Sequence, residues 1–247
     1  MPGPLDFALL MIFGAAWPLY SHFVDWPRHE RAVAAGDSTA RSRIYRRTIA
    51  EQWLLAGAAL ALCVWASRPL AGLGLAAPRG WRLTLSVLVT LGYVVLMAQQ
   101  LPAIAASPAT RAKLRERLQP LRALLPHTPG EFRWFVALSI TAGFCEELLF
   151  RGYLVWALRP WLGLFGAAAL SVVVFGLAHG YQGRKFGTQA FVAGLVLGAL
   201  ALVTRSILPG MVLHALVDLG SGYTTYLAMR EPAGSAASTT PGAAPIA

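Results

Sequence analysis

The sequence predicts an all-α membrane protein, a polytopic transmembrane helical bundle of about seven (six to eight) spans. The chain has 247 residues, of which 56% are hydrophobic and only 13% are charged, a composition too apolar for an ordinary soluble domain. Apolar runs near the roughly 20 residues needed to cross a bilayer recur along it. The basic residues, which give a formal net charge of +10, gather in short segments between these runs. This pattern favours a lipid bilayer as partner, and no nucleic acid.

The first predicted span is kept in the fold because the N-terminus lacks the basic region and the cleavage site of a removed signal peptide. The other spans are apolar runs separated by basic or turn-forming segments. The seven predicted spans lie near residues 4–23, 49–67, 82–101, 133–157, 161–181, 186–204 and 207–228.

Two basic segments, 25–47 and 107–127, predict the orientation. Cytoplasmic loops carry an excess of lysine and arginine, so both segments are expected in the cytoplasm, with the N-terminus outside and the C-terminus inside. The expected location is a bacterial cell (inner) membrane. Within 107–127, leucines at helical spacing predict an interfacial helix that is interrupted at Pro120 and serves as a lipid-facing linker. These leucines are Leu114, Leu118, Leu121 and Leu125.

Three regions follow from this organisation. Residues 1–129 are predicted to form N-terminal transmembrane helices with basic loops and the interfacial helix, and residues 130–228 a helical core that carries the chemistry. Residues 229–247, rich in Ala, Gly, Ser, Thr and Pro, are predicted to be a disordered tail.

Ionisable residues inside spanning helices cost about 2.5–3.5 kcal/mol each on insertion scales, so they usually face the bundle interior and have a function. Glu147 and Arg151 are four residues apart and lie about 40° apart around a helix, which predicts a structural ion pair. Glu146 lies about 140° from Arg151 and cannot share that bond. It is therefore the candidate general base.

Two later segments carry histidines. Phe175 and His179 share one helix face near the end of their span. His214 and Asp218 are also four residues apart, so the carboxylate is expected to hydrogen-bond the imidazole and fix its tautomer. At 1.5 Å per residue, Glu146 lies roughly 20 Å along its helix. His179 is expected nearer the cytosolic end, so the sequence alone does not bring the two together.

The patterns EExxxR, FxxxH and HxxxD, on successive apolar segments, resemble those of the CPBP (Abi) family of CAAX proteases, and EELLFRGYL is the strongest part. The resemblance covers roughly residues 130–225, and it implies that the helices surround a cytosol-facing intramembrane cavity. It implies an intramembrane endopeptidase that hydrolyses a peptide bond near the end of a membrane-anchored, possibly prenylated, protein or peptide. As the resemblance implies, Glu146 activates water, His179 assists it, and His214 with Asp218 stabilises the oxyanion. Phe175 is assigned to substrate binding.

Asp218 departs from this pattern, because the CAAX endopeptidases that the chain resembles have asparagine there. An ionised aspartate cannot donate a hydrogen bond to an oxyanion. Either Asp218 is protonated, or it orients His214, which then acts as the electrophile or as a metal ligand. The orienting role is the favoured interpretation.

Metal dependence is left open by the residues. Glu146, His179 and His214 would supply three ligands and leave one position for water, as catalytic zinc requires. The HExxH spacing is absent, and direct activation of water by Glu146 and His179 is equally consistent.

Two other classes of protein use buried charges of this kind. A non-proteolytic immunity or scaffold protein would use them to hold helices together, and a small transporter would use a Glu/His chain to relay protons. The halves of the chain show no similarity of the kind that inverted repeats of a transporter would have.

Overall fold

A computed structural model describes residues 1–229 of the chain, and these residues form helices and connecting turns without a strand. The all-α prediction is therefore confirmed for this part. The predicted tail, 229–247, lies outside the described residues apart from Met229, which ends the last helix. The α-helices are α1 (Pro4–Met11), α2 (Trp17–Tyr20), α3 (Trp26–Ala34), α4 (Ala40–Trp65), α5 (Trp81–Ala106), α6 (Pro108–Arg117), α7 (Pro129–Glu146), α8 (Val155–Ala178), α9 (Gly183–Thr204) and α10 (Leu208–Met229).

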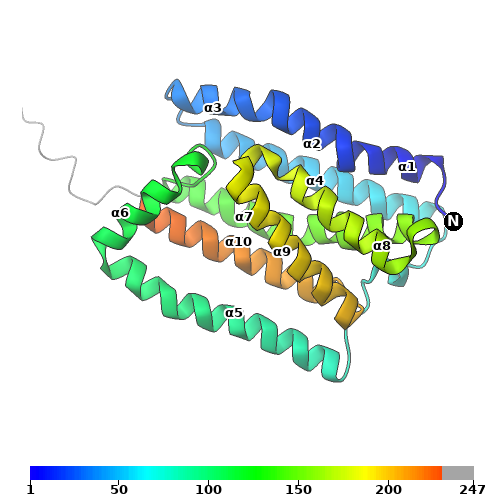
Figure 1. The fold of residues 1–247 in the computed structure, drawn as a ribbon. Coiled ribbons are helices and arrows are strands. Elements are labelled where there is room, and N and C mark those ends of the chain that lie inside the picture. The colour runs from blue at the N-terminus through cyan, green and yellow to red at the C-terminus, as the bar shows by residue number, and fades with distance from the viewer. Residues whose placement is uncertain (230–247) are drawn as a thin grey trace, which may run out of the picture.

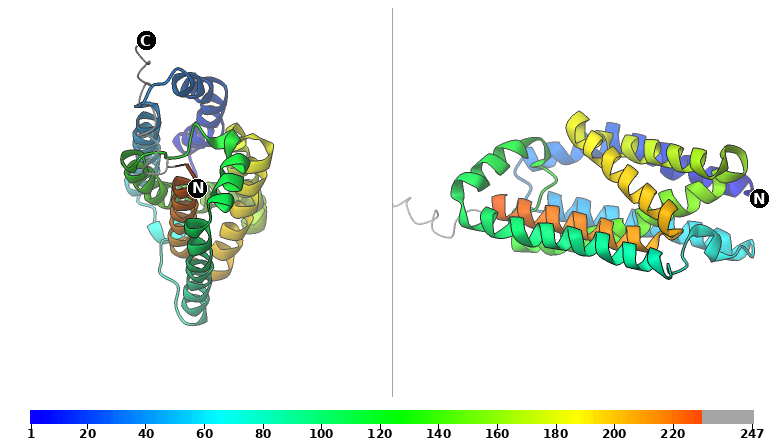
Figure 2. Two further views of the ribbon diagram at one scale, coloured as in Figure 1. Left: turned by 90° about the vertical axis from the view of Figure 1, so that its left-hand side faces the viewer. Right: turned by 60° about the horizontal axis from the view of Figure 1, so that its bottom comes forward.

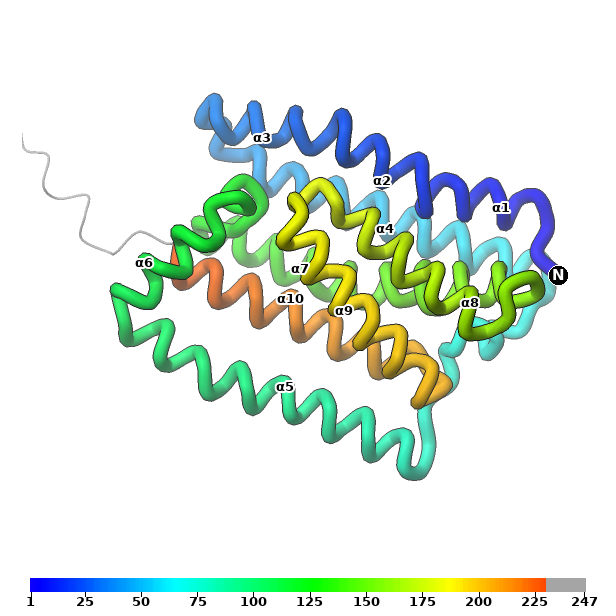
Figure 3. The backbone as a smooth tube through the Cα atoms, in the orientation of Figure 1, coloured from blue at the N-terminus to red at the C-terminus, as the bar shows by residue number. Residues whose placement is uncertain are grey.

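By length and apolar composition, five helical stretches within the described residues can cross a membrane: Pro4–Ala34, Ala40–Trp65, Trp81–Ala106, Pro129–Ala178 and Gly180–Thr204. The fourth stretch contains two arms, because the chain turns back at Gly163, whose φ of 66° is in the left-handed region (Figure 3). Counting both arms and adding α10 gives the seven predicted segments. Helix α10, which carries His214 and Asp218, is not among the five stretches.

The helices run back and forth along one long axis, and α10 lies inside the bundle against α7, α5 and α9 (Figure 1). Both predicted cytoplasmic loops, around α3–α4 and around α6, lie at the end of the bundle opposite Met1 (Figure 2). The predicted topology has both loops in the cytoplasm, so they must lie at the same end of the bundle, as they do.

The segment after α5 differs from the prediction. Helix α6 ends at Arg117, before Pro120, and a 3-10 turn follows. The leucines predicted to face lipid pack on the protein instead: Leu118, Leu121 and Leu125 are buried in a cluster with Phe186 and Met229. This cluster packs the segment after α6 against α9 and α10.

Near Met1, a buried ion pair ties the first helix to the motif-bearing segment. Arg68 donates to both carboxylate oxygens of Asp6 at 2.6 and 2.8 Å, and the Tyr153 hydroxyl donates to Asp6 Oδ1 at 2.6 Å. Asp6 is 2% exposed. A bidentate pair of this kind fixes orientation as well as distance, so α1 is anchored to the EELLFRGYL segment.

Helices α7 and α10 make their closest approach at Gly143. A Cβ at this position would lie 2.7 Å from both Ala215 N and Met211 O. Glycine is required here because backbone atoms cannot move aside as a flexible side chain does. This contact holds Glu146 and Glu147, one turn further along, opposite His214.

We expect Gly143→Ala to separate α7 from α10 and to lower the free energy of unfolding by about 1–3 kcal/mol, the usual cost of overpacking. Thermal unfolding in detergent measures this. Gly92→Ala, on α5 with nothing within 4 Å of its Cβ, is the matched control and should be neutral or stabilising. Equal unfolding temperatures for the two variants would contradict the close contact.

Candidate active site

The helix carrying the first motif begins at a capping box. The Thr128 hydroxyl accepts a hydrogen bond from Glu131 N at 3.2 Å, the Glu131 carboxylate accepts from Thr128 N at 3.0 Å, and Pro129 occupies the first helical position. These features fix the start of α7. The helix then widens into a π-helical segment, Glu147–Leu154. Such insertions are frequent at functional sites, and this one covers the motif after Glu146.

Glu147 and Arg151 form an ion pair in the bundle interior, with Arg151 Nη1 2.9 Å from Glu147 Oε1 and both side chains at most 2% exposed. Arg151 Nη2 also donates to the Gly194 carbonyl at 3.2 Å. The guanidinium carbon lies 4.2 Å from the centre of the Phe175 ring. Arg151 therefore joins α9 and the Phe175 ring to the motif, while neutralising the Glu147 charge.

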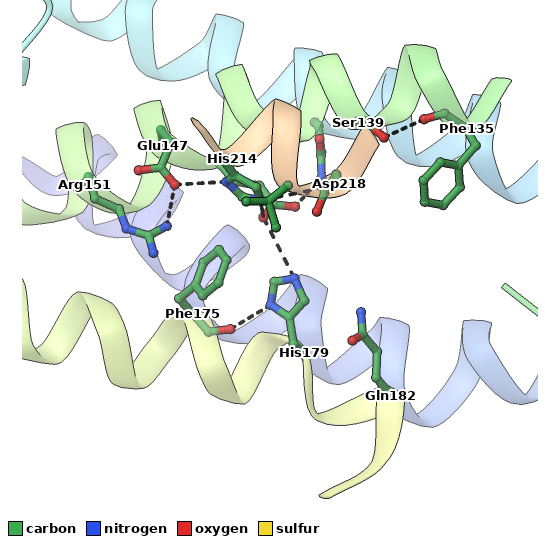
Figure 4. Close-up of polar contacts among 12 residues, drawn as sticks. Phe135, Ser139, Glu147, Arg151, Phe175, His179, Gln182, His214 and Asp218 are labelled. Carbon is green, nitrogen blue, oxygen red and sulfur yellow. Dashed lines mark hydrogen bonds and ion pairs between the residues drawn. The ribbon is translucent and has the colours of Figure 1, made fainter. Parts of the chain in front are cut away.

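The carboxylate that orients His214 is Glu147, and the prediction that Asp218 does so is wrong. His214 Nδ1 donates to Glu147 Oε1 at 3.0 Å, whereas Asp218 Oδ2 lies 3.8 Å from the other ring nitrogen, too far for a hydrogen bond. The close approach of α7 to α10 brings Glu147 to the inner edge of the ring. The Asp218 side chain is 37% exposed and faces the cavity (Figure 4).

His179 comes close to Glu146 in spite of its place in the sequence. The α8 arm from Leu164 to Ala178 rises only about 22 Å, so the α8–α9 turn ends short of the basic end of the bundle. His179 Nδ1 donates to the Phe175 carbonyl at 2.8 Å, which directs Nε2 toward the cavity. Its Nε2 lies 3.9 Å from Glu146 Oε2. The short arm therefore removes the mismatch in depth.

Glu146 has one oxygen bound and one free. Its Oε1 accepts from Gln52 Nε2 at 2.7 Å. Its Oε2 is buried and has no hydrogen-bond partner among the described residues, but it lies 3.8 Å from His214 Nε2 and 3.9 Å from His179 Nε2. Two histidine nitrogens and one carboxylate oxygen thus converge at distances too long for direct hydrogen bonds.

Sequence analysis missed Gln52, which lies on α4 in the second predicted span. The presence of a glutamine within an apolar span was the only sequence feature that pointed to a function for Gln52, and it was a weak one. Nothing in its spacing connected it with a glutamate 94 residues later.

These groups line a cavity of about 520 Å³ whose wall is built from the N-terminal helices as well as α7 to α10. The Phe175 ring also lines it but is 2% exposed and packs against the His179 ring, 4.5 Å away, and against Phe150. Four of the lining residues carry carboxylates, and within the part of the chain that the structure describes no lysine or arginine lines the cavity. These carboxylates belong to Asp25, Glu51, Glu146 and Asp218.

The predicted metal ligands do not fit a tetrahedral zinc site as they stand. With bonds of about 2.0–2.1 Å, zinc holds its ligand atoms on the order of 3.4 Å apart, whereas Glu146 Oε2 is 3.8 and 3.9 Å from the two histidine nitrogens. Among residues 1–229 no group of three His, Cys, Asp or Glu side chains has metal-binding geometry.

The structure is that of a helical membrane protein whose core brings a carboxylate and two histidines together. Residues 128–220 match the family model of the type II CAAX prenyl endopeptidase Rce1-like proteins. This match confirms the resemblance to CAAX proteases over these residues. No curated protein and no solved structure shows significant similarity to the chain.

Replacing one partner of the Glu147–Arg151 pair should be costly, because it leaves an uncompensated charge in the interior. We expect Arg151→Met or Glu147→Gln to lower the free energy of unfolding by about 3–5 kcal/mol. The double variant Glu147→Gln/Arg151→Met has no charge at either position, and the new amide oxygen at position 147 can still accept the hydrogen bond from His214. Most of the lost free energy of unfolding should therefore be recovered. Thermal unfolding of all three variants measures the effect.

Asp218→Asn is the comparison variant for this series. It changes a half-exposed carboxylate without a hydrogen bond, so its effect on stability should stay below about 1 kcal/mol. A loss as large as that of Arg151→Met would show that Asp218, and not Glu147, is the carboxylate on which the site depends.

Proposed function

We propose that the protein is an intramembrane endopeptidase that hydrolyses a peptide bond near the end of a membrane-anchored protein or peptide, with Glu146 as the base. The observation that carries this proposal is the free oxygen of Glu146. It faces the Nε2 atoms of His179 and His214 inside a cavity that can enclose a short peptide segment.

The first step is activation of water between these three atoms. Glu146 Oε2 accepts one proton of the water, and His179 Nε2 accepts a hydrogen bond from the other O–H. His179 can do so because its Nδ1 carries the hydrogen that binds the Phe175 carbonyl. The hydroxide formed attacks the carbonyl carbon of the scissile bond, and the π electron pair moves onto the carbonyl oxygen.

The oxyanion is then stabilised by His214. With Nδ1–H bound to Glu147, a protonated ring presents Nε2–H to the cavity. The carboxylates of Glu146, Glu147 and Asp218 all lie within 4 Å of this imidazolium, and Arg151 pairs with that of Glu147. Asp218 compensates the imidazolium charge across 3.8 Å without needing to donate a hydrogen bond.

Collapse of the tetrahedral intermediate breaks the C–N bond. The leaving nitrogen takes the proton that Glu146 accepted, passed directly or through His179 Nε2. The products are a membrane-anchored carboxylate and a released peptide with a new amino group, or the reverse, depending on which side carries the anchor.

The substrate class follows from the family and from the charge of the cavity. CAAX-type processing acts on a chain end held at the membrane, and a prenylated protein or a peptide precursor both meet this description. Asp25 and Glu51 are paired with Arg47, and the remaining carboxylates, Glu146 and Asp218, disfavour acidic side chains next to the scissile bond.

We place the active site on the cytoplasmic side of a bacterial cell membrane. Most of the basic residues lie around α3–α4 and α6, at one end of the bundle, and cytoplasmic loops carry such an excess. Tyr45 and Leu124 on the cavity wall belong to the elements at that end, which supports entry of substrate from the cytosol.

Glu146→Gln should reduce cleavage of a lipidated, internally quenched peptide by about 10²–10⁴-fold, the usual contribution of a general base. The amide keeps the side-chain volume and can still accept from Gln52, so unfolding temperature should stay within a few degrees of the wild type. Glu30→Gln, at an exposed position on α3, is the control. Full cleavage by Glu146→Gln would refute Glu146 as the base. A wild type that cleaves no peptide would favour the immunity or scaffold function, in which these residues only hold helices together.

The metal question has its own test. We expect a strong chelator, applied to the detergent-purified protein during turnover, to leave kcat/KM unchanged, because the site residues activate water without a metal. Loss of activity that returns on adding Zn²⁺ would show that Glu146, His179 and His214 close around a metal ion during catalysis.

A further inference from the structure

Gln52, on the N-terminal helix α4, donates a hydrogen bond to the candidate base, and it lies outside the residues that match the family model. We propose that Gln52 positions Glu146 through its amide nitrogen and binds a backbone N–H of the substrate through its amide oxygen. This inference rests on the proposed peptidase function and assigns a substrate contact within it.

The orientation of the amide follows from chemistry. Glu146 Oε1 lies 2.7 Å from Gln52 and can only accept a hydrogen bond while the carboxylate is ionised, so the amide must present its NH₂ group. Turned the other way, two oxygens would face each other at the same distance. The Gln52 oxygen therefore points away from Glu146.

That oxygen is a buried acceptor without a partner among the described residues, on a side chain that is 3% exposed. Leaving a buried amide oxygen unsatisfied costs about 1–3 kcal/mol. An apolar residue of similar size would avoid this cost. Gln52 lines the same cavity as Glu146 and the histidines, so the acceptor lies where a peptide is expected to bind.

The donor half of the amide acts on Glu146. By occupying Oε1, Gln52 holds the carboxylate in one rotamer and leaves Oε2 as the only oxygen that faces His179 and His214. Without this hydrogen bond the carboxylate can rotate and present either oxygen. A loosely held base costs rate even when it is present.

The acceptor half acts on the substrate. A peptide bound in the cavity brings backbone N–H groups that need acceptors once they leave water. Gln52 Oε1 can receive one of them, close to the scissile bond. The substrate is therefore required to have a free N–H at one defined position, where proline or an N-methylated residue would leave the oxygen unsatisfied.

The experiment compares Gln52→Met with wild type on the lipidated quenched peptide and on a set in which each peptide nitrogen near the cleaved bond is methylated in turn. Methionine keeps the length of the side chain and removes both hydrogen bonds. We expect kcat to fall about 10–100-fold, with the unfolding temperature equal to that of the wild type or higher. Gln99→Met, at an exposed position on α5, is the matched control and should behave as wild type.

Methylation supplies a readout that a purely structural role would not change. In the wild type, one methylated position should reduce kcat/KM at least 10-fold more than in Gln52→Met, because the variant has no acceptor to lose. If the two proteins respond alike at every position, the substrate contact is refuted. If kcat of Gln52→Met equals that of the wild type, the positioning role is refuted.

The Glu146→Gln variant separates this inference from the proposed function. An active Gln52→Met protein beside an inactive Glu146→Gln protein would overturn the role of Gln52 alone. Wild-type turnover by Glu146→Gln would overturn the peptidase assignment of Glu146, and the inference with it.

Discussion

The buried carboxylate of Glu147 is the interaction on which the rest of the site depends. One oxygen, Oε1, accepts from Arg151 and from His214, so a single atom joins the π-helical segment to α10. Such a charge is tolerated in a membrane interior only when it is paired. It also requires two backbones to come close, and the glycines at 143 and 210 allow this, since a Cβ at Gly210 would lie 3.0 Å from the other Glu147 oxygen. Packing and charge pairing therefore support each other at this point.

The two adjacent glutamates have opposite roles because the helix sends their side chains to different partners. Glu147 is fully buried and is held by a cation, whereas Glu146 turns one oxygen into the cavity. Each histidine is fixed in the same manner, with Nδ1 donating to a carboxylate or carbonyl oxygen and Nε2 left to face Glu146. Fixed tautomers direct both reactive nitrogens to one place. Side chains that rotated freely would have to lose this conformational entropy each time a substrate reacted.

Much of the architecture follows from sequence because its causes are local. Hydropathy predicts the spans, and the spacing of Glu147 and Arg151 predicts their ion pair, since both depend on one helix at a time. The partner of His214 could not be predicted in this way. Asp218 has the right spacing on α10, but the approach of α7 at Gly143 offers a nearer carboxylate. The leucines after α5 were assigned to lipid for a similar reason, because periodicity identifies an apolar face but not what covers it.

The N-terminal helices complete a site whose acidic and histidine residues all lie within residues 128–220. Residues 128–220 carry both glutamates, both histidines and Asp218, yet this segment alone leaves Glu146 Oε1 without its donor and the cavity without one wall. Helix α4 supplies both, and the Asp6–Arg68–Tyr153 cluster anchors α1 to the motif helix at the far end. In the proposed peptidase, α7, α8 and α10 carry the groups that move protons. The helices that precede them supply part of the cavity wall, so they would contact the substrate without taking part in proton transfer.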